Sequence, residues 1–209
     1  MPASTGAEPA IIVFARAPQA GRAKTRLIPR LGPEGAARLQ ARLILQALRV
    51  AQLARCGSVE LHGAPRAAHS FFAYCAARFK VELRNQKGRD LGERMHGAFT
   101  RALHRHRAVI LIGSDCPELR PRDLRRAARL LHGACDAVIA PAQDGGYALI
   151  GLKRAPRALF SGIAWGEASV YGETRTRLDA LGLRMRALRT VRDVDRPEDL
   201  AHARDFLHR

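Results

Sequence analysis

The sequence predicts a single α/β domain built on a mostly parallel, mixed sheet with helices on both faces. Short apolar runs alternate along the chain with longer segments whose apolar residues recur at helical spacing, which is typical of βαβ units. The apolar runs lack polar alternation, as expected for strands buried on both faces. A length of 209 residues fits one domain with a sizeable core.

Local sequence patterns predict where each strand and helix lies along the chain. The run Ile11-Ile12-Val13-Phe14-Ala15 predicts a first buried strand, and the run at 108–112 is the clearest strand. Glu34 lies near the start of the first helix, and Pro121 opens a later one, both at favourable positions. The other strands are expected at 58–61, 79–83, 136–140, 147–152 and 184–188. Helices are expected at 33–54, 65–78, 91–104, 121–131, 169–181 and 197–206. We expect the domain to span 10–209, after a disordered tail at 1–9.

Charge and composition exclude several classes of protein. The formal net charge is +17, but lysine occurs only four times and arginine is scattered along the whole chain, without a basic tail or an RNA-binding signature. This distribution argues against dedicated nucleic-acid binding and favours phosphorylated small molecules. The four cysteines form no C-x-x-C pair, so a zinc site is not expected. The first eight residues do not resemble a signal peptide, and no apolar run approaches the roughly 20 residues of a membrane helix. We therefore expect a cytoplasmic protein without membrane insertion.

A basic, glycine-bearing loop follows the first strand, where ligands bind in parallel sheets. It reads R-A-P-Q-A-G-R-A-K-T-R from Arg16 to Arg26 and carries four cations. Backbone N–H groups and cationic side chains in such a loop suit polyphosphate, although the spacing is not that of a Walker A loop. A solvated basic loop is the alternative. The residues expected to contact a nucleotide here are Ala15, Arg16, Pro18, Gly21, Lys24, Thr25 and Arg26.

Carboxylates follow two later strands of the predicted sheet. Asp115 comes directly after the strand at 108–112, where it could hold Mg²⁺ or Mn²⁺ through hard oxygen ligands or only cap the next segment. Asp193 and Asp195 follow the last strand and could supply a second carboxylate. Asp195 also precedes Pro197 at the start of a predicted helix, so an N-cap role is the alternative.

Two loops add candidates for the substrate pocket. The run Asp144-Gly145-Gly146-Tyr147 predicts a hairpin turn, and its glycines also let a ligand lie against the backbone. Trp165 and Glu167 lie in a loop that could line a pocket, and Arg94 lies in the first turn of a predicted helix. Asp144 and Glu167 are candidate bases. The sequence contains no G-x-S-x-G elbow and no G-x-G-x-x-G after the first strand, which disfavours a serine hydrolase and a dinucleotide-binding domain.

Taken in order, five segments resemble a known family. They read F-A-R-A-P-Q-A-G-R-A-K-T-R-L, D-L-G-E-R-M, L-I-G-S-D-C-P-E-L, I-A-P-A-Q-D-G-G-Y-A-L-I-G-L and D-V-D-R-P-E-D-L. Together they are similar to the DUF2064 proteins, which are glycosyltransferase-like members of the nucleotide-diphospho-sugar transferase (GT-A) superfamily, some of them labelled arsenosugar-biosynthesis glycosyltransferases. K-T-R-L and the D-x-P of Asp115 also resemble nucleotidyltransferases of molybdenum-cofactor and coenzyme F420 biosynthesis. The resemblance implies a Rossmann-like GT-A fold.

The ending D-R-P-E-D-L is similar to the D-T-P-E-D-L of CMP-sugar synthetases, where the leading aspartate binds Mg²⁺. The resemblance therefore implies that Asp115 and Asp195 are the metal pair, with Asp193 as a substitute for Asp195. The run Trp165-Gly166-Glu167 departs from the Trp-Ser or Trp-Gly-Thr expected in relatives.

These observations predict a metal-dependent transferase with a nucleotide-activated donor, a small-molecule acceptor, and Mg²⁺ or Mn²⁺. Two reactions stay open. A glycosyltransferase takes a nucleotide sugar and leaves a nucleoside diphosphate, whereas a nucleotidyltransferase takes a nucleoside triphosphate and releases pyrophosphate. A non-catalytic nucleotide-binding module is the alternative of another class. No pattern in the sequence indicates an oligomeric state.

Overall fold

In the computed structural model, residues 8–202 are described. The expected disordered tail falls mainly on residues 1–7, which lie outside the described residues. The last predicted helix begins within the described part as α6, Asp199–His202, and its expected remainder at 203–206 also lies outside. Within the described residues, no helix is long and apolar enough to cross a membrane.

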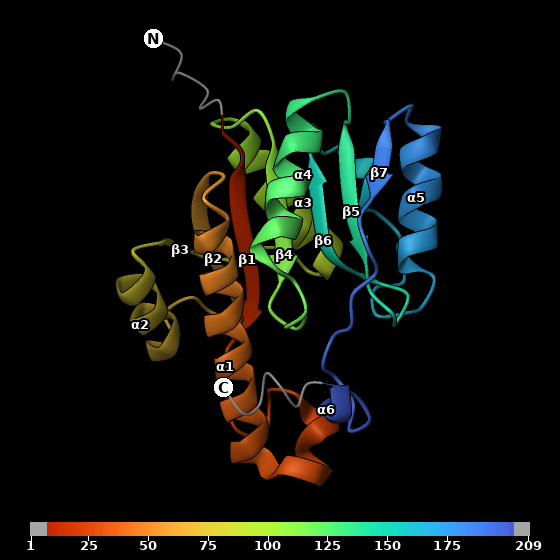
Figure 1. Cartoon of the computed structure of the whole chain (residues 1–209). Helices are drawn as coiled ribbons and strands as arrows, with labels where there is room; N and C mark the ends of the chain where they lie inside the picture. Colours follow the sequence, from red (N-terminus) through yellow and green to blue (C-terminus); the bar gives the residue numbers. More distant parts are fainter. Residues whose placement is uncertain (1–7, 203–209) are drawn as a thin grey trace.

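A seven-stranded mixed sheet forms the centre of the molecule, in the order β3-β2-β1-β4-β6-β5-β7 (Figure 1). All neighbouring strands pair in parallel except β6, which is antiparallel to both β4 and β5. The predicted mostly parallel, mixed sheet is therefore confirmed. The strands are β1 Ala10–Arg16, β2 Ser58–Ala64, β3 Glu82–Asn85, β4 Val109–Gly113, β5 Ala137–Pro141, β6 Tyr147–Leu152 and β7 Met185–Ala187.

Helices cover both faces of this sheet, because side chains alternate between the faces along each strand. Ile11 and Val13 of β1 belong to a core cluster that also holds buried residues of α1, α2 and α4. Ile12 and Phe14 belong to a second cluster with α3 and α5. The helices are α1 Ile28–Ala54, α2 Ser70–Phe79, α3 Leu91–Leu103, α4 Pro121–His132 and α5 Val170–Ala180, with short 3₁₀ turns η1 Thr25–Leu27 and η2 Arg157–Leu159.

The start of α1 carries a kink that matters for the site. Gly32 has a φ of 68° and Pro33 follows it, so two helices meet there and the longer one begins where the sequence predicts it. The short first part lies beside α6, beyond the end of the sheet (Figure 1). Here Leu27, Leu39 and Leu43 form a third apolar cluster with Val194 from the chain's last described segment. This cluster fastens the end of the chain to the loop that follows β1.

Three predicted elements have wrong boundaries, the first being the strand expected at 58–61, which continues to Ala64 as β2. The helix expected from residue 65 begins at Ser70, because His69 keeps an extended backbone and its Nδ1 accepts a hydrogen bond from Phe71 N at 3.2 Å, which caps the helix. The strand expected at 79–83 lies at Glu82–Asn85 instead. Lys80 adopts a left-handed conformation, with a φ of 51°, and ends α2 at Phe79. The run at 79–83 therefore contains the last residue of α2, Phe79, and the first residues of β3, which begins at Glu82.

Candidate active site

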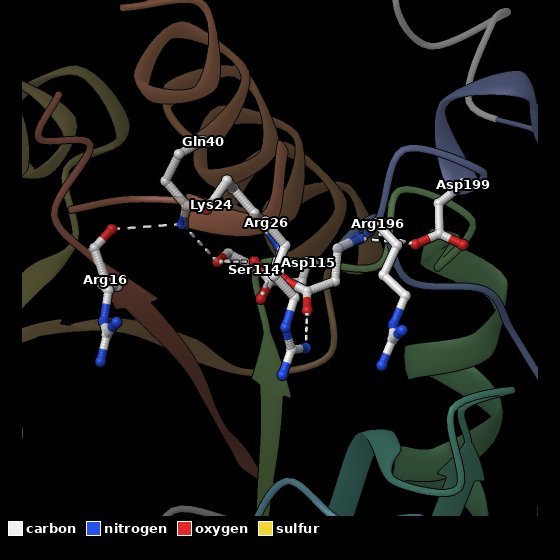
Figure 2. Close-up of polar contacts among 9 residues, drawn as sticks. Arg16, Lys24, Arg26, Gln40, Ser114, Asp115, Arg196 and Asp199 are labelled. Carbon is white, nitrogen blue, oxygen red and sulfur yellow. Dashed lines mark hydrogen bonds and ion pairs between the residues drawn. The ribbon is translucent and has the colours of Figure 1, made fainter. Parts of the chain in front are cut away.

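Three segments far apart in the sequence meet at the carboxyl end of β1 and β4. Phe14 pairs with Gly113, so the basic loop and the Ser114-Asp115 turn leave the sheet at the same level. The last segment joins them because Val194 N donates to the backbone oxygen of Asp115 at 2.9 Å. Val194 is also buried in the apolar cluster beneath, so its neighbour Asp195 is held beside Asp115. Figure 2 shows labelled side chains of all three segments gathered at one place, among them Lys24, Asp115 and Asp199.

Lys24 occupies the centre of this group. Its Nζ lies 3.0 Å from Oδ2 of Asp115 and 3.6 Å from Oδ1 of Asp195. The Lys24 side chain is only 3% exposed, whereas those of Asp115 and Asp195 are 48% and 33% exposed. Arg26, which is exposed, lies with Nη1 2.5 Å from Oδ2 of Asp195. The structure therefore brings together the two carboxylates predicted as a metal pair and places a buried ammonium between them.

A second chain of contacts holds Asp115 from below. Gln40 of α1 is buried and its Nε2 donates to Ser114 Oγ at 3.2 Å and to the backbone oxygen of Arg16 at 3.3 Å. Ser114 Oγ in turn donates to Oδ1 of Asp115 at 3.1 Å. Figure 2 shows this chain running from the helix to the carboxylate. One oxygen of Asp115 is thus held by Ser114 while the other faces Lys24.

Asp199, rather than Asp195, makes the capping contacts at the last turn. Its Oδ2 accepts hydrogen bonds from Asp195 N at 3.0 Å and Arg196 N at 2.7 Å. The Asp195 side chain is instead directed at Lys24 and Arg26. Of the two roles considered for Asp195, the structure therefore supports a place in the site and not the N-cap.

The donor set suits a divalent cation that is shared with a substrate. The oxygens of Asp115 and Asp195 converge on one point, now taken by the Lys24 ammonium. Carboxylate oxygens are the ligands that Mg²⁺ and Mn²⁺ prefer, and Mg²⁺ commonly uses one or two carboxylates together with substrate phosphates. No group of three or more His, Cys, Asp or Glu suited to a metal occurs among residues 8–202. Two carboxylates completed by phosphate oxygens would therefore fit, whereas an all-protein cage would not.

Asp193 lies within reach of the negative charge of Asp144, near the same carboxyl edge of the sheet. Burial raises the pKa of Asp193 to about 6, and the charge of Asp144 adds to this effect. Burial and the charges of Asp115 and Asp193 likewise raise the pKa of Cys116 well above its ordinary value. The carboxylate of Asp144 accepts from Gly146 N at 2.9 Å within its own turn. Lys24 forms its ion pairs with Asp115 and Asp195, and its charge also acts on Asp193, whose role as a substitute ligand stays a prediction.

The Asp-Gly-Gly run forms the predicted hairpin between β5 and β6. Gly145 has a φ of +88°, and a Cβ there would lie 2.2 Å from the backbone oxygen of Ala168. Its own backbone oxygen accepts from Tyr171 N at 2.8 Å, at the start of α5. Gly145 therefore serves the packing of the hairpin against the loop before α5. Tyr147, predicted to bind substrate, packs its ring against the cluster of α3 and its OH lies 3.9 Å from Met95 Sδ.

The remaining pocket candidates form a second group around the start of α3. A Cβ on Gly92 would lie 2.7 Å from Nε1 of Trp165 and 2.4 Å from the backbone oxygen of Phe160, so glycine is needed for this loop to pack there. Arg94 donates from Nε to the backbone oxygen of Gly88 at 3.0 Å, which is a structural contact. Glu167 is exposed in the same loop as Trp165. The contacts of Trp165, Arg94 and Glu167 do not include Lys24, Asp115 or Asp195.

The residues of the basic loop that are predicted to bind a nucleotide differ in their burial and contacts. Ala15 is buried, and its backbone oxygen accepts from Gln86 Nε2 at 3.2 Å. Gly21 has a φ of +75° with open space around it, in a turn closed by the bond from Arg22 N to the oxygen of Gln19 at 3.0 Å. Pro18 is half-buried, and Arg16 and Thr25 are exposed. Among the four cations of the loop, Lys24 alone is buried.

Gln40, Ser114 and Gln86 also support the site, although the sequence did not single them out. Gln86 ties β1 to β2 through the backbone oxygens of Ala15 and His62. Gln40 had a signal in the sequence, because it is a polar residue on the apolar face of a predicted helix, between Leu39 and Leu43. Its partner Ser114, 74 residues away, carried no such signal.

Several solved structures are similar to this chain over most of its length. A Desulfovibrio desulfuricans protein with a proposed nucleotide-diphospho-sugar transferase activity is 34% identical, with a TM-score of 0.82 over 91% of this chain and 84% of that one. A Mycobacterium tuberculosis protein solved with manganese shares 21% identity and a TM-score of 0.61 over 95% and 98% of the two chains. A CMP-2-keto-3-deoxy-manno-octonic acid synthetase solved with CTP shares 13% identity and a TM-score of 0.58 over 96% and 98%.

The first likeness confirms the expected class, a glycosyltransferase-like protein of the nucleotide-diphospho-sugar transferase type, and the other two support the fold. The chain belongs to the family of uncharacterized proteins conserved in bacteria named DUF2064, whose model matches residues 47–167. Comparison with curated proteins gives no significant match.

Proposed function

We propose that this protein is a metal-dependent transferase that binds a nucleotide-activated donor at the carboxyl edge of the sheet. The observation that carries the proposal is the meeting of a cationic loop with two carboxylates, Asp115 and Asp195, from three distant segments. The half-exposed carboxylates suit Mg²⁺ or Mn²⁺, and the loop beside them suits the phosphates of the donor. The side chains of Asp115 and Asp195 are 48% and 33% exposed, so both carboxylates remain open to solvent and to a bound substrate.

Catalysis at such a site is positioning and electrostatic stabilisation. An acceptor oxygen attacks the donor, the bond to the donor's phosphate breaks, and the negative charge collects on the departing phosphate group. Asp115 and Asp195 would hold Mg²⁺ or Mn²⁺, which would supply a Lewis acid for this charge. Arg26, at the same edge, stabilises the same charge without covalent chemistry. Asp144 is the base that we favour for the acceptor's proton, because its charge reaches Asp193 and Cys116 beside the metal pair. Glu167 is the alternative base, exposed in the loop that packs against Gly145.

A nucleotide sugar is the donor that this proposal favours, which makes the protein a glycosyltransferase. The support is the 34% identity to a protein with a proposed nucleotide-diphospho-sugar transferase activity. The alternative is nucleotidyl transfer from a nucleoside triphosphate, which is favoured by the Lys24-Thr25-Arg26-Leu27 run and by the fold shared with a CTP-bound synthetase. The products separate the two, because a nucleoside diphosphate accumulates in the first reaction and pyrophosphate in the second.

Thermal shift measurements with nucleotide sugars and nucleoside triphosphates, each with and without Mg²⁺ or Mn²⁺, test the proposal. A ligand that binds only the folded state raises its stability by roughly 2.7 kcal/mol at a hundred times its dissociation constant. We expect a metal-dependent shift with at least one nucleotide sugar, and its loss in Asp115→Asn. Shifts that are unchanged in Asp115→Asn would overturn the metal assignment. Binding of a ligand without any turnover would instead favour the alternative, a non-catalytic nucleotide-binding module.

A further inference from the structure

The ammonium group of Lys24 is buried without a full set of hydrogen-bond acceptors among the described residues. Its side chain is 3% exposed, yet its Nζ makes no hydrogen bond of good geometry within the part of the chain that the structure describes. The charge is balanced by Asp115 and Asp195, but the three N–H donors of the ammonium are not matched by acceptors. A buried ammonium in this state costs more free energy than one with its donors satisfied.

The backbone of Lys24 is also held in an unfavourable conformation. Lys24 has φ and ψ of 47°, in the left-handed region that side chains other than glycine rarely adopt. Such a conformation is unfavourable for a residue with a Cβ, because the Cβ comes too close to the following carbonyl oxygen. Residues held in such conformations cluster at ligand sites and switch regions, where the surrounding structure over-determines them. The loop therefore aims Lys24 at the two carboxylates despite two unfavourable contributions.

The position of the ammonium coincides with the point where a shared divalent cation would bind. Nζ lies 3.0 Å and 3.6 Å from the carboxylate oxygens that converge there. A metal at that point would lie against the ammonium, and two cations at such a distance repel each other strongly in a partly buried site. Lys24 has to withdraw before both carboxylates can bind the metal.

We infer that Lys24 is a resident cation that competes with the divalent metal for Asp115 and Asp195. In the free protein Lys24 neutralises the carboxylates, so the metal alone binds weakly. Donor phosphates offer the ammonium another set of negative oxygens, which frees the carboxylates, so metal and donor bind cooperatively. This inference rests on the proposed function for the identity of the metal and the donor. It adds that the metal enters together with the nucleotide and not before it.

Mn²⁺ titration without any nucleotide, followed by electron paramagnetic resonance, tests this competition. We compare the wild-type protein with Lys24→Met, which removes the charge and keeps most of the side chain's length. Arg26→Gln is the matched control, because Arg26 also contacts Asp195 but is exposed and free to swing into water. We expect Lys24→Met to bind Mn²⁺ about tenfold more tightly or better, since a neighbouring charge acts strongly in a buried site, and Arg26→Gln to change little.

Further variants make the result decisive. Lys24→Gln provides a second neutral side chain should Lys24→Met not fold, and Lys24→Arg, which keeps the charge, is expected to bind Mn²⁺ as weakly as the wild type. Adding Asp115→Asn to Lys24→Met is expected to remove the gain. A gain in the neutral variants no larger than that of Arg26→Gln would overturn the competition and leave the metal pair intact. Absence of Mn²⁺ binding in every variant without nucleotide would also overturn the competition. Absence of binding in every variant with a nucleotide sugar present as well would overturn the metal pair itself, and the proposed function with it.

Discussion

Two buried ions of opposite sign, Glu60 in the sheet and Lys24 at its edge, are surrounded in different ways. Glu60 of β2 is 4% exposed, and both of its oxygens are hydrogen-bonded. Oε1 accepts from Arg105 at 2.7 Å, and Oε2 lies 2.8 Å from His62 Nε2 and 3.1 Å from Arg84 Nε. Lys24 has two carboxylates near it but no hydrogen bond of good geometry within the described residues.

The difference separates a structural ion from one suited to exchange its partners. The partners of Glu60 come from β2, β3 and the turn after α3, so the cluster ties the edge of the sheet together. The partners of Lys24 are half-exposed carboxylates that can take water or another cation at little cost. Burial of an ion is therefore a poor guide to its role unless the hydrogen bonds and the exposure of its partners are known.

Glu60→Ala is expected to have the largest effect on stability. Removing the carboxylate leaves Arg84, Arg105 and His62 without their common partner and opens a cavity, so we expect a loss of about 3 kcal/mol in the free energy of unfolding. Urea denaturation measures this loss. Glu82→Ala is the control, because Glu82 contacts the same two arginines from a half-exposed position. A loss for Glu60→Ala no larger than that for Glu82→Ala would contradict the structural role.

The contribution of Glu60 is expected to depend on pH. Burial alone would raise the pKa of Glu60, but the hydrogen bond from His62 and the charges of His62, Arg84 and Arg105 together lower it below its ordinary value of 4.5. A lowered pKa in the folded state stabilises the protein above the unfolded value, and this contribution is lost as the pH falls through the folded value. The stability difference between wild type and Glu60→Gln should therefore be constant just above pH 4.5 and shrink below it. A difference that grows on acidification would mean that the pKa is raised.

Gln40→Leu, beside the Lys24 group, is expected to have a smaller effect on stability than Glu60→Ala. The change removes the donor to Ser114 Oγ and to the oxygen of Arg16, so we expect a loss of about 1–2 kcal/mol in the free energy of unfolding. Asp115 also loses its indirect support through Ser114. Weaker Mn²⁺ binding, measured in the presence of the nucleotide, should accompany the loss. Unchanged metal affinity would mean that Ser114 alone positions the carboxylate.

Arg26→Gln is expected to have the smallest effect on stability. Arg26 is 62% exposed and its ion pair with Asp195 is screened by water, so we expect a change of less than about 0.5 kcal/mol. Urea denaturation at low and high salt checks this expectation. A loss of about 2 kcal/mol would show that the exposed ion pair, and not the buried Val194, holds the last segment in place.

The sequence allowed much of the fold to be predicted, because apolar runs and helical spacing report burial directly. The strand at 147–152 and the start of the helix at Leu91 agree with the prediction to the residue. The order of strands in the sheet and the cap at His69 depend on contacts between distant segments or on backbone angles, which composition does not report. Likewise Asp115 and Asp195 were recognisable as candidates from their place after strands, whereas the insertion of Lys24 between them depends on a left-handed backbone angle.

The most direct test of the metal–nucleotide site is calorimetric titration of a nucleotide ligand into the wild-type protein and into Asp115→Asn, with and without Mn²⁺. We expect Mn²⁺ to strengthen nucleotide binding to the wild-type protein, and we expect this coupling to be lost in Asp115→Asn. Equal nucleotide affinity with and without Mn²⁺ in both proteins would contradict a shared metal and nucleotide site at Asp115 and Asp195.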